Sequence, residues 1–240
     1  MNYAYLYINK LSGDERTELF DQLKTSLKVL KRVEPNHGSV HVFNSGDQET
    51  QEFCEQQGCF SRTIKTTRNY GGLIDILIEK INLLKDFDPN QDVTLLDIDT
   101  VFTRPVPADA WQSNVAVLWS AEYYITQFRN LDQVLPLLPW HEVGINFDPS
   151  FIMYNTGVVY IPRQHRKEIC EKALWIADRL NSGEYDPEHR HGSKLDEQIG
   201  LSIAIHDVYG RFGKIRMSSD FIHHYWNEKA NGNKWWLNYE

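Results

Sequence analysis

The sequence is poor in cysteine and in basic charge and has no long apolar run, and each shortage excludes a class of protein. Three cysteines among 240 residues are too few and too scattered for the disulfide framework of a small secreted domain. The formal charge of −8 argues against a nucleic-acid-binding surface. No stretch approaches the roughly 20 apolar residues that cross a bilayer, and the N-terminus has no signal-peptide pattern. We therefore expect a cytoplasmic protein with free thiols, no membrane span and no nucleic-acid partner.

The first hundred residues alternate between strand patterns and helix patterns. Short apolar and β-branched runs predict strands at 3–8, 39–43, 59–63 and 93–96. Helical patterns lie between them, and the first begins at a capping box made by Ser12 and Glu15. This alternation predicts an α/β fold with a mostly parallel sheet and helices on both faces.

The second half of the chain is less regular. Residues 115–121 and 151–161 have strand patterns, and the latter is interrupted by Asn155-Thr-Gly157. Amphipathic helices are expected at 164–180 and 194–208, and residues 123–148 are loop-rich. The aromatic C-terminal segment is expected to fold back onto the protein or onto a ligand.

Two aspartates follow the apolar run at 93–96. Asp97 and Asp99 are expected at the carboxyl end of a buried strand, where ligands collect in open α/β sheets. Two carboxylates in one pocket repel each other unless a cation lies between them. Carboxylate oxygens suit Mg²⁺ or Mn²⁺, which bridge to substrate phosphates. The motif predicts a metal–diphosphate site, although a chain with 33 acidic residues also contains such triplets by chance.

Five short motifs occur in an order that resembles the GT-A nucleotide-sugar glycosyltransferases, in particular the glycogenin and bacterial galactosyltransferase group. They are Asp97-x-Asp99, Tyr154-Asn-Thr-Gly-Val-Val159, Asp196-Glu-Gln198, His224-Tyr225 and Gly232-x-Lys234-x-Trp236. The resemblance implies a GT-A, Rossmann-like sheet with a smaller acceptor-side lobe. It implies one domain over 1–240, with a nucleotide-binding half at 1–102 and an acceptor half with a closing segment at 103–240.

The resemblance also implies a metal site. Asp97, Asp99 and His224 match the three protein ligands of a Mn²⁺ or Mg²⁺ ion, and an imidazole ligand suits Mn²⁺ better. His223 is the competing ligand, because the match to the family motif could be shifted by one residue. A histidine that packs in the core or lies on the surface is the structural alternative for either position.

Further residues match positions that bind a nucleoside diphosphate sugar. Lys234, after Gly232, matches a basic residue on the diphosphate, and Arg68 a position that meets donor phosphate or sugar. Asn155 matches a residue that faces the donor sugar, and Asn9 lies where the family binds the nucleoside. Simpler explanations are a tight turn for Asn155 and a solvated lysine for Lys234.

The acidic motif Asp196-Glu197-Gln198 matches an element near the reacting carbon of the sugar. Acidic residues at a helix N-terminus, where they interact well with the helix dipole, are the alternative. The implied reaction moves a sugar from a nucleoside diphosphate sugar, expected to be a UDP-sugar, to a hydroxyl of a glycan or glycoconjugate. Likeness to glycogenin implies retention of configuration, whereas an inverting enzyme would need a base such as Glu122 or Asp196.

Two departures from the family pattern leave the donor and acceptor open. Thr156 stands where the family has alanine, and Trp235 where proline is common. A non-catalytic nucleotide-sugar-binding module is therefore the main alternative. A phosphatase is a weaker one, because Val101 stands where the phosphatase motif needs threonine.

Overall fold

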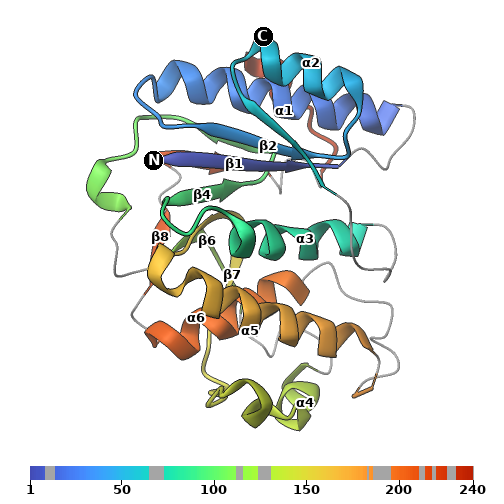
Figure 1. Cartoon of the computed structure of the whole chain (residues 1–240), viewed down its shortest axis with the longest axis vertical. Helices are drawn as coiled ribbons and strands as arrows, with labels where there is room; N and C mark the ends of the chain where they lie inside the picture. The colour runs from blue at the N-terminus through green and yellow to red at the C-terminus, as the bar shows by residue number, and fades with distance from the viewer. Residues whose placement is uncertain are drawn as a thin grey trace.

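The computed structural model describes most of the chain (Figure 1). The described residues are 1–8, 14–64, 73–111, 116–123, 131–182, 184–185, 196–210, 214–217, 220–225 and 231–239. For 14–16, 73–76, 119–123 and 214–216 the backbone alone is described.

The first half has the predicted alternation of strands and helices. Its elements are β1 (Asn2–Tyr7), α1 (Asp14–Val33), β2 (Val40–Asn44), α2 (Gln48–Gln56), β3 (Phe60–Thr63), α3 (Leu73–Asp86) and β4 (Val93–Leu96). The Asp47 carboxylate caps α2 by accepting from the backbone N–H of Thr50 at 3.0 Å. Ser12 of the expected capping box lies outside the described residues.

The second half contains more short elements than the sequence predicts. They are β5 (Thr100–Phe102), η1 (Ala108–Ala110), β6 (Ala116–Tyr123), α4 (Leu131–Val134), η3 (Leu135–Leu137), η4 (Trp140–Val143), β7 (Met153–Tyr160), α5 (Arg163–Ser182), α6 (Asp196–Tyr209), β8 (Lys214–Met217), β9 (Ile222–His224) and η5 (Trp235–Tyr239). The expected break at Asn155-Thr-Gly157 is absent, since β7 runs through it. The irregularity appears instead as register shifts between β6 and β7.

Seven strands form one sheet to which both halves of the chain contribute. Their order is β3-β2-β1-β4-β7-β6-β8. The pairs β1–β2, β1–β4, β2–β3 and β6–β8 are parallel, while β7 is antiparallel to both β4 and β6. The sheet is therefore mostly parallel, as predicted. Helices α1 and α2 lie on one side of it, and α3, α5 and α6 on the other (Figure 1).

Alternate residues of β1 pack into two different apolar clusters. Tyr3, Tyr5 and Tyr7 pack with the apolar stripe of α1, while Ala4 and Leu6 pack with α3, α5 and α6. Successive side chains of a strand point to opposite faces, so one short strand serves both cores. This explains why β1 has no polar side in its sequence pattern.

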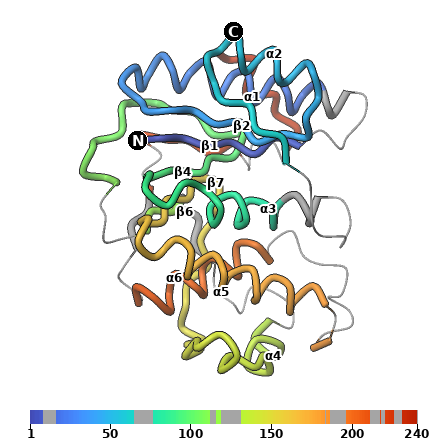
Figure 2. The backbone as a smooth tube through the Cα atoms, viewed as in Figure 1, coloured from blue at the N-terminus to red at the C-terminus, as the bar shows by residue number. Residues whose placement is uncertain are grey.

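A third cluster forms a smaller lobe at the end of the molecule away from α1 (Figure 2). It joins α4, η3 and η4 to α5 and α6. The rings of Trp140 and Phe147 stack in it at 4.7 Å. The lobe matches the smaller lobe that the family resemblance implies.

The aromatic C-terminal segment packs into the core. Trp235 and Trp236 are buried in the cluster that contains the α1 stripe, and Tyr225 stacks on Trp235 at 4.5 Å between ring centroids. Of the two interpretations that the sequence left open, core packing is the one observed for both tryptophans. Cys54, Cys59 and Cys170 are free and buried. Among the described helices, none combines the length and apolar character needed to cross a bilayer.

Candidate metal centre

The turn after β4 places Asp97 and Asp99 at the carboxyl end of that strand. The backbone N–H of Asp97 donates to the Gly157 carbonyl at 2.9 Å, and the Thr100 hydroxyl donates to the Asp97 carbonyl at 2.6 Å. The Ser26 hydroxyl of α1 lies 2.6 Å from the Thr100 carbonyl oxygen. Hydrogen bonds to β7, within the turn and to α1 thus stabilise the turn. They fix the direction in which its two carboxylates point.

His224 reaches the same place through a separate ribbon of two strands. β5 and β9 pair antiparallel with Thr100 opposite His224, and the Tyr225 N–H donates to the Asp99 carbonyl at 2.8 Å. His224 Nε2 lies 3.0 Å from Asp99 Oδ1 and 3.6 Å from Asp97 Oδ2. The structure thus brings together the three predicted ligands, and their candidate ligand atoms lie within 4.8 Å of one another.

The competing histidine is oriented differently. His223 precedes His224 on the short strand β9, so its side chain projects to the opposite face. Its ring packs at 4.3 Å against Tyr225. Of the two histidines, the buried His224 is therefore the one that faces the aspartates.

A glycine makes room for the imidazole. A Cβ atom at Gly157 would lie 2.2 Å from His224 Nδ1 and 2.7 Å from its Cγ, closer than real side chains approach. Any larger residue here would push His224 out of its position. The two carboxylates and the imidazole form an oxygen and nitrogen donor set that fits Mn²⁺.

Lys80 belongs to the site, and sequence reasoning missed it. From α3 its Nζ lies 2.5 Å from Asp97 Oδ1 and 3.8 Å from Glu197 Oε1, and its side chain is only 8% exposed. Burial lowers the pKa of Lys80, but the carboxylates of Asp97, Glu197 and Asp99 outweigh it and raise the pKa above its ordinary value. The ammonium therefore stays charged. In the sequence it is one polar position of an amphipathic helix, with no signal of its own.

The acidic motif lies at the buried N-terminus of α6. Glu197 Oε1 accepts a hydrogen bond from the Thr156 hydroxyl of β7. Burial raises the pKa of Glu197 to about 7, against the opposing effects of Lys80 and Thr156. Asp196 is fully buried, and Gln198 is half-buried. Thr156, a departure from the family pattern, thus has a defined partner.

Asn155 and Lys234 make contacts that fit their simpler explanations. Asn155 Oδ1 accepts from the Gly157 N–H at 2.8 Å, so the side chain supports the backbone of β7. Lys234 Nζ lies 2.5 Å from Glu18 Oε1 on α1, with both side chains partly exposed. Gly232 has φ of 74°, a conformation that favours glycine. Their binding roles stay predictions.

Three other predicted positions belong to the parts of the chain that are not described. Asn9 and Arg68 lie outside the described residues, as does the side chain of Glu122.

The assembled site carries an excess of negative charge. One ammonium, that of Lys80, lies among the carboxyl groups of Asp97, Asp99 and Glu197, and the two aspartates already outnumber it. Buried carboxylates need compensating positive charge, and a single lysine supplies less than these carboxylates require. The electrostatics therefore favour a cation beside Asp99 and His224.

No protein family and no curated protein matches the chain in sequence. Solved structures do match it in fold. The galactosyltransferase LgtC, in complex with donor and acceptor sugar analogues, has a TM-score of 0.54 at 14% identity, over 91% of this chain and 74% of LgtC. Mouse xyloside xylosyltransferase 1 has 0.51 at 11% identity, over 91% of this chain and 85% of that chain. The glycosyltransferase GlyE of Streptococcus pneumoniae has 0.50 at 13% identity, over 91% of this chain and 45% of that chain. These likenesses confirm the predicted GT-A fold.

Proposed function

We propose that this protein is a metal-dependent glycosyltransferase. It moves a sugar from a nucleoside diphosphate sugar, expected to be a UDP-sugar, to a hydroxyl group of a glycan or glycoconjugate. The observation that carries the proposal is the meeting of Asp97, Asp99 and His224, from two separate strand pairings, at the carboxyl edge of a GT-A sheet. The fold of the similar structures supports it, because all of those named are glycosyltransferases.

In this proposal Asp97, Asp99 and His224 hold a Mn²⁺ or Mg²⁺ ion. When bound, the ion supplies positive charge to the diphosphate leaving group. Lys80 orients the Asp97 carboxylate and adds a second fixed positive charge beside it. Both charges are in place before the reaction begins, which is the condition under which electrostatic stabilisation is most effective.

The remaining predicted residues are assigned to the donor and the acceptor. Lys234 exchanges Glu18 for the diphosphate, and Gly232, with its φ of 74°, forms the backbone turn that precedes it. Arg68 contacts the donor phosphate or sugar, Asn155 the sugar and Asn9 the nucleoside. These assignments follow the family resemblance.

The acidic motif Asp196-Glu197-Gln198 is assigned to the reacting carbon. Glu197 is bonded to Thr156 and lies beside Lys80, so its proposed role is to position these groups. Gln198 Oε1 is buried and has no hydrogen-bond partner in the part of the chain that the structure describes, which leaves it available to a substrate hydroxyl. We propose a retaining reaction. NMR of the product anomer tests it, and a β-product from an α-donor would contradict retention.

The second candidate is a non-catalytic module that binds a nucleotide sugar. One observation favours it, namely that Lys80 Nζ lies 2.5 Å from Asp97 Oδ1 and so supplies this carboxylate with a counter-charge from the protein itself. Nucleotide binding without sugar transfer to a broad panel of hydroxyl acceptors would support this alternative, and transfer to any acceptor would eliminate it.

The first experiment is thermal unfolding with UDP or GDP, with and without Mn²⁺, on the wild type and Asp99→Asn. A ligand that binds the folded state raises the melting temperature by mass action. We expect a Mn²⁺-dependent shift with UDP that Asp99→Asn abolishes. Asp109→Asn, at an exposed position in η1, is the matched control and should keep the shift. A Mn²⁺-dependent shift that is unchanged in Asp99→Asn would contradict the proposed metal site.

A further inference from the structure

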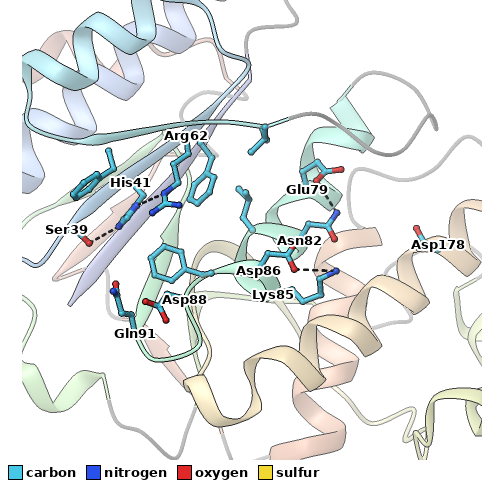
Figure 3. Close-up of a pocket in the computed structure, with 15 residues that line it drawn as sticks. Ser39, His41, Arg62, Glu79, Asn82, Lys85, Asp86, Asp88, Gln91 and Asp178 are labelled. Atoms are coloured by element: carbon cyan, nitrogen blue, oxygen red, sulfur yellow. Dashed lines mark hydrogen bonds and ion pairs between the residues drawn. The ribbon is translucent and has the colours of Figure 1, made fainter.

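A pocket of about 980 Å³ lies beside α3 and does not include the candidate metal ligands (Figure 3). One wall consists of side chains of β2 and β3, and the other of side chains of α3. On α3 the pocket is lined by the helical stripe Glu79, Asn82, Leu83 and Asp86. Lys80 lies between two of these positions in sequence and contacts Asp97 and Glu197 instead. Helix α3 thus contributes one set of side chains to this pocket and another, Lys80, to the candidate metal centre.

Stacked rings form the strand wall of the pocket. The His41 ring stacks on Phe60 at 5.0 Å with an interplanar angle of 19°, and meets Phe87 edge-on, also at 5.0 Å. Phe60 is 57% exposed, so its ring is accessible to a ligand. Stacking on His41 fixes the position of the Phe60 ring. The wall therefore presents a flat aromatic surface that is already ordered.

A chain of hydrogen bonds orients a guanidinium group beside these rings. Arg62 Nε donates to His41 Nδ1 at 3.1 Å, which leaves His41 Nε2 to donate to the Ser39 hydroxyl at 2.8 Å. Ser39 in turn donates to Asn2 Oδ1 at 3.0 Å. Within the described residues, the terminal nitrogens of Arg62 make no hydrogen bond or ion pair, so they are available to a ligand.

The charges of the pocket disfavour an anionic ligand, and the guanidinium of Arg62 beside the aromatic rings disfavours a cation there. Acidic side chains outnumber the two basic ones, Arg62 and Lys85. The acids are Glu79, Asp86, Asp88 and Asp178, and the amides of Asn82 and Gln91 add donors and acceptors. An anion such as a phosphate or sulfate group would meet this surplus of carboxylates. A polyhydroxylated neutral molecule can use the carboxylates as acceptors and Arg62 as donor.

We propose that this pocket is a second, non-catalytic site that binds a neutral oligosaccharide. The C–H face of a pyranose ring would lie on Phe60, and its hydroxyl groups would bond to Arg62 and the acidic wall. The volume is at the upper end of the roughly 300–1,000 Å³ typical of ligand pockets, and so suits several sugar units. The inference does not depend on the proposed transfer reaction, because no candidate metal ligand lines the pocket.

Saturation-transfer NMR on the whole protein tests the proposal. The neutral probes are maltotriose, cellotriose, chitotriose and lactose, and a sulfated heparin disaccharide is the anionic comparison. We expect at least one neutral probe to bind, and Phe60→Ala and Arg62→Ala each to weaken its binding about tenfold or more. Both residues are exposed, so the variants should keep the wild-type melting temperature.

Two control variants separate this site from other surfaces. Leu137→Ala removes another exposed apolar side chain, outside the pocket, and should leave binding unchanged. Asp99→Asn should remove Mn²⁺-dependent nucleotide binding and leave oligosaccharide binding intact. The proposal is wrong if no neutral probe binds at about 10 mM. It is also wrong if neither Phe60→Ala nor Arg62→Ala weakens binding, or if the sulfated probe binds more tightly than every neutral one.

Discussion

Two lysines supply positive charge in the proposed reaction, and the protein holds them in opposite ways. Lys80 is buried in α3 among carboxylates from the turn after β4 and from α6. Lys234 lies in the C-terminal segment, where its side chain is 57% exposed and pairs with the partly exposed Glu18. The first charge is part of the folded core, and the second can exchange partners in water.

The difference in burial separates two kinds of contribution. A buried ammonium cannot leave its carboxylates without exposing unpaired charges to a medium of low polarity, so Lys80 shapes the site permanently. An exposed ion pair contributes little to stability and forms or breaks easily. Stability should therefore depend on the buried cluster, and ligand affinity should be adjustable at the C-terminal segment.

The largest expected effect is on folding, in Lys80→Met. Removing the ammonium leaves the half-buried Asp97 and the buried Glu197 without their partner, which should lower the free energy of unfolding by about 3 kcal/mol. Urea unfolding of the metal-free protein measures it. Lys167→Met is the control, because Lys167 pairs with Glu171 where both side chains are exposed. Equal losses in the two variants would break the proposed contrast between buried and exposed lysines.

The same cluster should make stability depend on pH. Because the pKa of Glu197 is raised from 4.5 to about 7, the folded state binds a proton that the unfolded state has already released in this range. The contribution of Glu197 to stability is therefore fully present below pH 4.5 and is lost as the pH rises to 7, by roughly 3 kcal/mol. Glu197→Gln should remove this slope in metal-free protein, as measured by urea unfolding at several pH values. The exposed control Glu171→Gln should keep it, and a wild-type stability that rises over this range would contradict the assignment.

The next effect concerns the room that Gly157 leaves for His224. In Gly157→Ala the new methyl group would meet the imidazole at 2.2 Å, and displacing this ligand should weaken Mn²⁺ binding about 10–100-fold. Titration of Mn²⁺ followed by water-proton relaxation measures the affinity. Gly200→Ala is the control, because its methyl group would meet the Ala173 carbonyl between α5 and α6. Both variants should lose stability, and a similar loss of Mn²⁺ affinity in Gly200→Ala would show a global rather than a local effect.

Local sequence patterns were sufficient for the first half of the fold and for the two aspartates of the candidate metal centre. The strands and helices up to β4 are marked by local apolar runs or helical stripes, and Asp97 and Asp99 follow an apolar run whose carboxyl end is a ligand position in such sheets. The short strands β5, β8 and β9 have no room for a recognisable period. β9 forms because it pairs with β5, more than a hundred residues earlier in the chain.

Residues that depend on packing between distant elements escaped prediction for the same reason. Lys80 acquires its role because the N-terminus of α6 and the end of β4 both meet α3. Thr156 looked like a departure from the family pattern, but its hydroxyl bonds to Glu197, 41 residues away. Neither contact has a sequence spacing that a single chain reveals.

The smallest effect on stability is expected at the exposed lysine. Lys234→Met should change the free energy of unfolding by less than about 0.5 kcal/mol, since the pair with Glu18 is exposed to solvent. If the segment closes over the diphosphate, the same variant should weaken Mn²⁺–UDP binding about three- to tenfold, measured by calorimetry. Lys24→Met removes a comparable exposed pair with Asp21 and should leave nucleotide affinity unchanged. Equal nucleotide affinity in Lys234→Met and the wild type would contradict a contact between Lys234 and the diphosphate. Lys80 would then be the lysine that supplies positive charge near the diphosphate.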